Sequence, residues 1–265
     1  MENKNIIGLR LHFTRIKYDN TFYKNQCPNL EEYRVIDCTS RNQEFARDLS
    51  PFFLGPAVGP DGATAATVEQ FFQSGKVYPC HDNGGTPNEE FFRWRDRMYS
   101  KQPHELTKQE LRHPQKLLGY EHSDCLYFPW YDKETGTYIP LDYVTSRKKV
   151  YIPNYARLVS QTPGYQRLKE LVDAGEKIAL ADFDTYNYYD DGAKTKKYES
   201  YIAKCKKENV IPTVTLDDFL NIKTMKDVLT CPFIPAGHAF VIKALLQGDI
   251  EVKDGKFLDH LGLLD

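Results

Sequence analysis

The sequence has almost no net charge. Its 35 lysines and arginines face 37 aspartates and glutamates, which leaves a formal charge of −2. Sequence-independent binding to duplex nucleic acid draws on the release of counterions from phosphates, and this requires an excess of basic side chains. We therefore do not expect such binding to be the main task of the protein, although the composition allows a local basic pocket.

Paired cysteines and long apolar runs are also missing. The six cysteines are scattered along the chain, and none belongs to a Cys-x-x-Cys pair. No leading apolar segment has the form of a signal peptide, and no run is long enough to span a membrane. These absences predict reduced thiols, a cytoplasmic location and no membrane partner.

Three motifs that mark common enzyme classes do not occur. The sequence contains no phosphate-binding P-loop, no Gly-x-Gly-x-x-Gly dinucleotide fingerprint after a strand and no Gly-x-Ser-x-Gly nucleophile elbow. Nucleoside triphosphatases, Rossmann dehydrogenases and serine hydrolases with these signatures are therefore not expected.

What is present is typical of a folded α+β domain. Hydrophobic residues make up 41% of the chain and aromatic residues 13%, which is enough for a sizeable core. We expect one mainly helical domain over residues 1–265, with a few short strands and a long insertion or lid at about 79–141. Periodicity predicts strands at 6–13, 34–38 and 178–183, a hairpin around 254–255, and helices at 68–78, 88–99, 143–158, 165–172, 198–208, 215–229 and 237–246.

The predicted helix at 68–78 places three polar side chains together. At about 100° per residue, Glu69, Gln73 and Lys76 cluster at the border of an apolar face. Thr67 and Gln70 have the spacing of a capping box, which places the start of the helix near Val68.

An acid, an amide and an amine in this arrangement suit chemistry at a sugar C1′ atom. A buried amine with a lowered pKa can form a Schiff base with a ring-opened sugar, and Lys76 is the candidate. Glu69 could transfer protons to and from the leaving nitrogen and the ring oxygen, while Gln73 holds a hydroxyl or the base. The alternative is an ordinary half-exposed helix with three polar positions.

Two acids and a histidine supply further candidates. Asp182 and Asp184 alternate at the end of the predicted strand, so they share a face and could bind ribose hydroxyls or assist proton transfer. The alternative is that both acids are solvated or cap the next element. His238 begins a predicted helix, where backbone N–H groups can hold phosphate; a structural histidine is the other interpretation.

The segment Phe91–Arg97 mixes guanidinium groups with aromatic rings. This mixture suits pyrophosphate contacts and base stacking, with Trp94 and Arg95 as the preferred residues, but such side chains also cover ordinary cores. His122, Asp124 and Cys125 have no recognised zinc spacing, so we expect no metal.

Several of these segments together resemble the NADAR family, also called YbiA-like. The turns at 48–53 and 59–62 followed by the Glu-x-x-x-Gln-x-x-Lys helix at 67–76 are similar to its signature in order and spacing. The segments 146–171, 178–182 and 237–246 are similar to its downstream part. The chain departs from the family pattern at Pro51, where the family has asparagine, and it lacks a Trp-Gly pair after the acidic strand.

The resemblance implies a NADAR-type fold and an N-glycosidase that cleaves the C1′–N bond of an ADP-ribosylated or ribosylated nucleobase, within nucleic acid or free. It implies that Lys76 is the Schiff-base lysine, and that Glu69 and Asp182 are the catalytic acids. Substrate-binding roles are expected for a wider set: Ser50, Phe52, Gln73, Trp94, Arg95, Asp184 and His238. No cofactor is required, and the alternative is a non-catalytic module that binds ADP-ribose or a modified nucleotide. The sequence does not indicate the oligomeric state.

Overall fold

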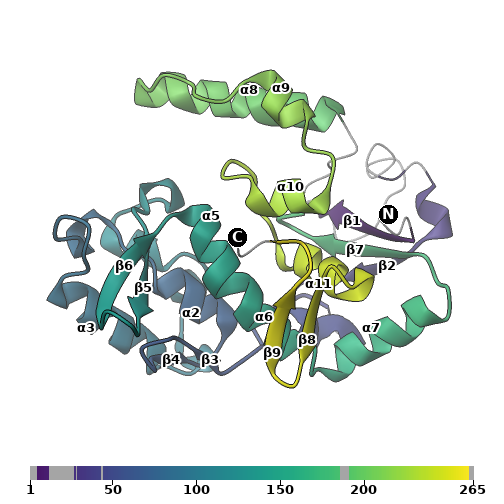
Figure 1. Ribbon diagram of the computed structural model, residues 1–265, viewed down its shortest axis with the longest axis horizontal. Helices are drawn as coiled ribbons and strands as arrows, with labels where there is room; N and C mark the ends of the chain where they lie inside the picture. The colour runs from purple at the N-terminus through teal and green to yellow at the C-terminus, as the bar shows by residue number, and fades with distance from the viewer. Residues whose placement is uncertain (1–4, 12–26, 28, 43, 186–190, 263–265) are drawn as a thin grey trace.

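The computed structural model describes residues 5–11, 27, 29–42, 44–185 and 191–262. It mixes helices and short strands along the chain and belongs to the α+β class. Figure 1 shows an elongated molecule with a small sheet at one end and a group of helices with a hairpin at the other.

The sheet at one end has three parallel strands. In spatial order these are β1 (Ile6–Arg10), β7 (Ile178–Asp182) and β2 (Arg34–Asp37). Every residue of β7 is buried, as expected for the central strand of a parallel sheet covered on both faces. Arg10 is in register with Asp182, and Asp37 with Ala181, so the carboxyl ends of the three strands lie at one edge.

Helix α11 (His238–Gln247) packs against β1 and β7. Eight of its ten residues are buried, which explains its apolar sequence. A second, smaller core cluster gathers around the opposite face of β7 and includes Leu9, Leu30, Ala179 and Ala181. After α11, the hairpin of β8 (Ile250–Lys253) and β9 (Lys256–Asp259) completes the described chain at this end.

The other end of the molecule is built around a short helix and two hairpins. Its elements are β3 (Ala57–Val58), β4 (Thr64–Ala65), α2 (Val68–Ser74), α3 (Glu89–Tyr99), α4 (Lys108–Arg112), β5 (Phe128–Asp132) and β6 (Thr137–Leu141). Six side chains from the segment 79–141 belong to the main core: Trp94, Met98, Tyr99, Leu106, Phe128 and Leu141. Much of this segment is therefore part of the central packing.

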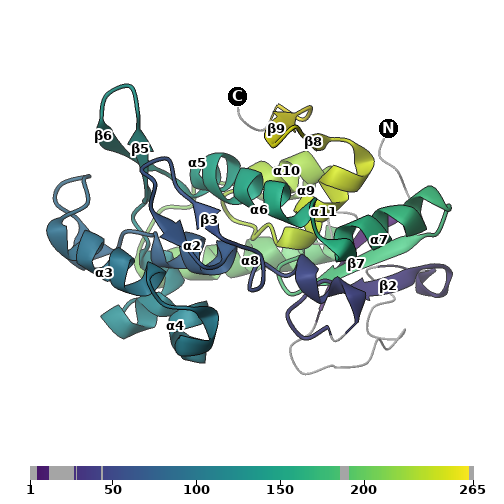
Figure 2. The ribbon, with the colours of Figure 1, turned by 90° about the horizontal axis from the view of Figure 1, so that it is seen from below.

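A continuous helical segment joins the two ends. It consists of α5 (Tyr143–Ser146), a π-helical turn (Arg147–Tyr151) and α6 (Ile152–Val159), and α7 (Pro163–Asp173) follows it. In Figures 1 and 2, α6 lies between α2 and α11. The side chains of this segment can therefore contact both ends.

Arg147 lies in the π-helical turn and is almost completely buried. Its Nη1 atom donates to the carbonyl oxygens of Val228 and Leu229, both at 3.1 Å. Its Nη2 atom donates to those of Cys231 at 3.2 Å and Ile234 at 3.3 Å. These carbonyls lie at and beyond the end of α10 (Met225–Thr230), where backbone donors run out; the Val228 carbonyl also accepts from Cys231 N at 3.3 Å. Arg147, which lies in the π-helical turn, thus donates hydrogen bonds to the carbonyls at the end of α10.

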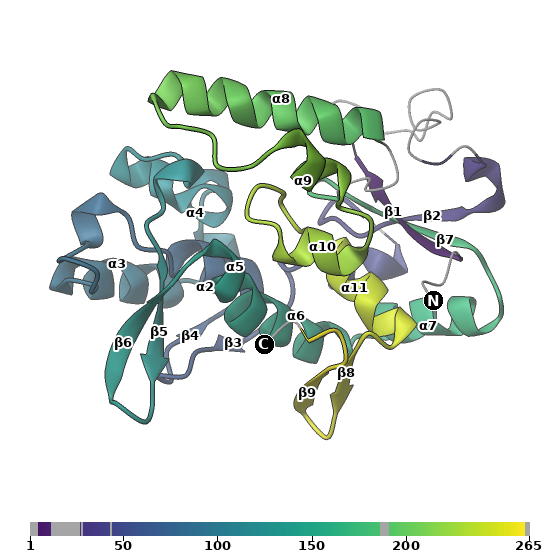
Figure 3. The ribbon, with the colours of Figure 1, turned by 45° about the horizontal axis from the view of Figure 1, so that its top comes forward.

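Helix α8 (Asp191–Glu208) forms an arm together with α9 (Leu216–Leu220). Figures 1 and 3 show α8 as a long helix across the top of the molecule. Lys194 anchors the arm, because its buried ammonium group donates to the Asp191 carboxylate at 2.8 Å and to the Leu220 carbonyl at 3.1 Å. In the described part of the chain, none of the helices has the length and apolarity needed to cross a membrane.

The predicted strands at 34–38 and 178–183, the helix at 88–99 and the C-terminal hairpin agree with the structure. Of the strand predicted at 6–13, residues 12 and 13 lie outside the described residues. Two helix boundaries were wrong. Helix α2 ends at Ser74 because Val77 pairs with Tyr127 in an isolated β-bridge, and α8 begins at Asp191, well before residue 198.

We predict that Arg147→Ala lowers the free energy of unfolding by about 3 kcal/mol or more, because several buried carbonyls lose their donor. Denaturant unfolding followed by circular dichroism measures this. The control is Arg157→Ala, which removes an exposed arginine of α6 and should change stability by no more than about 0.5 kcal/mol. Equal effects of the two substitutions would contradict the role given to Arg147.

Candidate active site between helix α2 and strand β7

Helix α2 is fixed by a capping residue and by one buried amide. The Thr67 hydroxyl accepts from the Gln70 backbone N–H at 3.1 Å, which is half of the predicted capping box. The Gln70 side chain does not complete the box. It accepts from Ala66 N at 3.0 Å and donates to the carbonyls of Met98 and Lys101, so it ties α2 to the end of α3.

Gly75 lets the end of α2 pack closely against its neighbours. A Cβ atom at this position would lie 2.7 Å from the Tyr99 hydroxyl and 2.8 Å from a ring carbon of Phe128. Both rings belong to the core, so neither can move away easily. The glycine therefore allows Lys76 to follow directly after a tightly packed helix end.

Glu69, Gln73 and Lys76 form one hydrogen-bonded chain, as their spacing predicted. Lys76 Nζ donates to Gln73 Oε1 at 2.6 Å, and Gln73 Nε2 donates to Glu69 Oε1 at 3.1 Å. All three side chains are half-buried, so protein surrounds them without sealing them from a ligand. The amide connects the amine to the carboxyl and fixes the orientation of both.

A row of contacting rings lies next to this chain and extends towards the sheet. Lys76 Nζ lies 4.8 Å from the centre of the Phe72 ring. Phe72 contacts Tyr151 at a centroid distance of 5.1 Å, Tyr151 stacks on Tyr155 at 5.9 Å, and Tyr155 contacts His238 at 5.7 Å. We call these four rings, Phe72, Tyr151, Tyr155 and His238, the aromatic row. It connects α2 to the start of α11 through α6.

Asp182 and His238 form the far end of the site. His238 Nε2 lies 2.7 Å from the Cys38 carbonyl oxygen, which can only accept, so this nitrogen carries a proton. His238 Nδ1 lies 3.2 Å from Asp182 Oδ2. Asp182 Oδ1 accepts from the Phe183 N–H at 2.7 Å. These contacts are those of a structural histidine, rather than of a histidine at a phosphate site.

Gly237 makes the approach of α11 to Asp182 possible. A Cβ atom there would lie 2.1 Å from Asp182 Oδ2 and 3.1 Å from Asp184 Cβ. Any larger residue would push the acids or the helix away. The glycine before His238 is thus a requirement of the site geometry.

Burial changes the protonation of the groups on α2. Burial raises the pKa of Glu69 to about 7, although Lys76 and the Gln73 hydrogen bond oppose this shift. Burial also lowers the pKa of the Lys76 amine, although Cys125, Glu69 and Asp184 oppose it. Near neutral pH, these shifts move the pair towards a protonated acid beside a neutral amine.

The two ends of the site interact electrostatically. Asp184 acts to raise the pKa of Glu69, and His238 acts to lower it, in addition to the larger effect of burial. Desolvation, followed by the charge of Asp182, raises the pKa of Asp184. Burial also raises the pKa of Tyr151, which lies within the field of Glu69, Asp182 and Asp184. The structure therefore brings together Glu69, Gln73, Lys76, Asp182, Asp184 and His238.

The turn that contains Ser50 and Phe52 supports the start of α2. The Glu69 N–H donates to the Pro51 carbonyl at 3.2 Å, and Val68 N donates to the Leu54 carbonyl at 2.8 Å. Ser50 is completely buried, and the Arg112 guanidinium lies 5.5 Å from the Phe52 ring. The Ser50 hydroxyl accepts from Phe52 N at 3.5 Å and its carbonyl accepts from Phe53 N at 2.9 Å, so its contacts lie within this turn.

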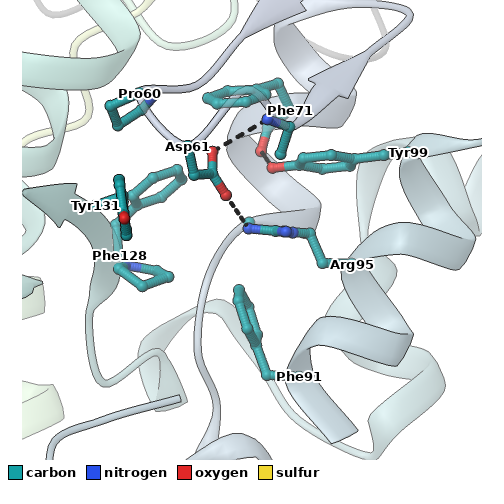
Figure 4. A pocket seen from close by; sticks show the side chains of 11 residues that line it. Pro60, Asp61, Phe71, Phe91, Arg95, Tyr99, Phe128 and Tyr131 are labelled. Carbon is teal, nitrogen blue, oxygen red and sulfur yellow. Dashed lines mark hydrogen bonds and ion pairs between the residues drawn. The ribbon is translucent and has the colours of Figure 1, made fainter. Parts of the chain in front are cut away.

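Trp94 and Arg95 do not belong to the group of Glu69, Gln73 and Lys76. Arg95 Nη1 contacts Asp61 Oδ2 at 2.6 Å beside Phe71 and Gly75 (Figure 4). The space left there is about 10 Å³, room for about one water molecule. Trp94 is buried, and its ring lies 5.9 Å from that of His81. The arrangement favours the core interpretation of both residues.

Four side chains near the site were not selected from the sequence: Tyr151, Cys125, Arg10 and Lys197. Tyr151 and Tyr155 are four residues apart in a predicted helix, and this spacing could have indicated a shared face. Cys125 acts on the pKa of Lys76, Arg10 acts on that of Asp184, and Asp184 acts on that of Lys197. Cys125, Arg10 and Lys197 come from distant segments, so no local spacing connects them to Lys76 or Asp184.

No group of three or more His, Cys, Asp or Glu side chains in the described residues is arranged to hold a metal ion. His113 and His122 do approach each other, with Nδ1 and Nε2 separated by 3.1 Å.

In comparisons with known proteins, no family model matches the chain, and no curated protein or solved structure is significantly similar to it. The resemblance to the NADAR family stays a prediction from the sequence.

We predict that Glu69→Gln has a higher free energy of unfolding than wild type at pH 8, by a larger margin than at pH 4. Because the folded state raises the pKa of Glu69 from 4.5 to about 7, its stabilising contribution is present below pH 4.5 and is lost as the pH rises through about 7. Glutamine removes this loss.

The measurement is denaturant unfolding of both proteins at pH 4 and pH 8, with Glu170→Gln on the exposed face of α7 as control. A difference between wild type and Glu69→Gln that stays constant over this range would show that Glu69 has an ordinary pKa.

Proposed function

We propose that the protein is an N-glycosidase that cleaves the C1′–N bond of a ribosylated or ADP-ribosylated nucleobase through a Schiff base on Lys76. The observation that carries this proposal is the pairing, through Gln73, of an amine of lowered pKa with a carboxyl of raised pKa. An imine-forming lysine must be neutral when it attacks, and an acid of pKa about 7 can donate a proton at neutral pH.

The roles follow from the proton balance of the reaction. The Lys76 amine forms a bond to C1′ while the C1′–N bond breaks and its electron pair stays on the base nitrogen. Glu69 supplies the proton that this nitrogen takes up. The C1′–O4′ bond then opens to give the protonated imine, and the ring oxygen takes up the proton that the attacking amine has given up. Addition of water to the imine releases the sugar as an aldehyde and restores the amine.

The far end of the site suits the rest of the sugar. Asp182 and Asp184 can accept hydrogen bonds from ribose hydroxyls, and the position of Asp182 is fixed by Phe183 N and His238. The rings of the aromatic row are buried and pack against one another beside these polar groups. No cofactor or metal is part of this mechanism.

A binding module without turnover is the alternative. The same acids and amine could hold ADP-ribose or a modified nucleotide through hydrogen bonds alone. This alternative requires no neutral amine, so it differs from the enzyme in its dependence on Lys76.

We predict that borohydride traps a covalent adduct between the protein and an ADP-ribosylated guanine substrate, because reduction converts the imine to a stable amine. Mass spectrometry of the intact protein and of its peptides should place the added mass on Lys76. Lys76→Ala should give no adduct, whereas Lys226→Ala, which removes an exposed lysine of α10, should behave as wild type.

A panel of ADP-ribosylated DNA, ADP-ribosylated RNA and free ribosylamine phosphates identifies the substrate class in the same assay. Binding that is unchanged in Lys76→Ala, together with no product and no adduct from wild type on any of these substrates, supports the binding module and rejects the glycosidase.

We also predict that the pH profile of kcat/KM contains a decline with its midpoint near pH 7, because Glu69 must be protonated to act as the acid and its pKa is about 7. The neutral fraction of Lys76, which grows with pH, opposes this decline. In Glu69→Gln this decline should disappear, and the rate at pH 6 should drop by about 10²- to 10⁴-fold. A Glu69→Gln profile with the same shape and height as that of wild type would exclude Glu69 as the acid.

A further inference from the structure

Tyr143, at the start of α5, carries an aromatic ring that is open to solvent. The residue is 42% exposed, although it belongs to the same helical segment as the buried Tyr151 and Tyr155. Arg147 lies on one face of the ring, with its Cζ atom 4.4 Å from the ring centre. The exposed part of the ring is therefore its other face and its edge.

The spacing of the helical segment directs Tyr143 towards the candidate site. Tyr143, Arg147, Tyr151 and Tyr155 recur every four residues, a spacing that keeps side chains on neighbouring parts of one helix face. Tyr151 and Tyr155 belong to the aromatic row, and the π-helical turn joins them to α5. Turns of this kind are rare and are frequent at functional sites. Tyr143 thus continues the aromatic row past Arg147 towards solvent.

Tyr143 is held in place from two sides. Asp142 caps α5, because its Oδ1 atom accepts from Thr145 N and its Oδ2 atom accepts from the Thr145 hydroxyl, both at 2.8 Å. The Arg147 guanidinium beneath the ring is fixed by its carbonyl acceptors at and beyond the end of α10, which lies next to α5 in Figures 1 and 3. A ring fixed in this way loses little further freedom when a ligand packs on it.

Asp184 connects Tyr143 to the rest of the site electrostatically. Burial raises the pKa of the Tyr143 hydroxyl, Arg147 opposes this shift, and Asp184 adds to it. Asp184 also acts on the pKa of Lys76, and Tyr143 acts on that of Tyr151. The hydroxyl end of the ring therefore lies among the groups of the site, while part of the ring reaches solvent. A ligand that contacts Asp184 can thus extend to Tyr143.

We propose that Tyr143 is a positioning residue that stacks on a purine ring of the substrate. This inference rests on the proposed function, because the sugar at Lys76 and Asp184 is the point from which the purine extends. Stacking between a nucleobase and an aromatic side chain needs an open ring face and no particular donor or acceptor. The purine is either the departing base or the adenine of ADP-ribose, which present the same flat surface.

Isothermal titration calorimetry with guanosine 5′-monophosphate, ADP-ribose and ribose 5-phosphate tests this. Tyr143→Leu keeps an apolar side chain but lacks the flat ring, so it should weaken the binding of a purine probe about tenfold or more and leave that of ribose 5-phosphate unchanged. Tyr143→Phe keeps the ring and should bind as wild type. Weaker binding of guanosine 5′-monophosphate identifies the departing base as the stacked ring, and weaker binding of ADP-ribose alone identifies the adenine.

The matched control is Tyr131→Leu, which removes a half-buried tyrosine ring beside Asp61 and Arg95 (Figure 4) and should leave all binding unchanged. The proposal is wrong if wild type binds neither purine probe, or if Tyr143→Leu binds both as wild type does. It is also wrong if Tyr143→Phe or Tyr131→Leu loses as much affinity as Tyr143→Leu, or if ribose 5-phosphate binding falls equally. Circular dichroism establishes that each variant is folded.

The binding assay requires no turnover, so it separates this proposal from the glycosidase. Purine binding that depends on Tyr143, without any borohydride adduct on Lys76, would reject the glycosidase and leave a purine-binding site at Tyr143. An adduct on Lys76, together with purine binding that is the same in Tyr143→Leu as in wild type, would support the glycosidase and reject the role of Tyr143.

Discussion

The aromatic row is the contact on which the arrangement of the candidate site depends. Phe72 belongs to α2, Tyr151 and Tyr155 belong to the helical segment through α6, and His238 begins α11. Ring-to-ring packing over these elements joins the Lys76 end of the site to the sheet end. Phe72 of this row lies against Lys76, and burial is the largest cause of the pKa shifts of Glu69 and Lys76.

The polar contacts then decide which groups stay charged. Gln73 holds the amine and the carboxyl in one chain, so neither can turn away to solvent without losing a hydrogen bond. Two further acids, Asp182 and Asp184, lie in the same field. Burial of acids together with an amine is costly for folding unless the groups share protons, and perturbed groups of this kind are frequent at functional sites. The close packing that Gly75 and Gly237 permit is needed for the same arrangement.

The sequence predicted those parts of the fold and the site that depend on local spacing. The stripe of Glu69, Gln73 and Lys76 follows from helical periodicity, and the acids after β7 follow from the end of an apolar strand. Long-range contacts were not predictable in this way. The pairing of Val77 with Tyr127 ends α2, and the partner of Arg95 is Asp61, more than thirty residues away. Arg147 looks like a surface residue in the sequence, yet its acceptors lie more than eighty residues along the chain.

The central claim is that Lys76 is an amine whose surroundings favour its neutral form. NMR titration of ¹³C-methylated lysines measures this directly, with the Lys76 signal identified by its absence in Lys76→Ala. The account predicts that Lys76 titrates below the ordinary lysine value of 10.5, while exposed lysines such as Lys226 titrate near it. A Lys76 midpoint equal to that of the exposed lysines would contradict the account.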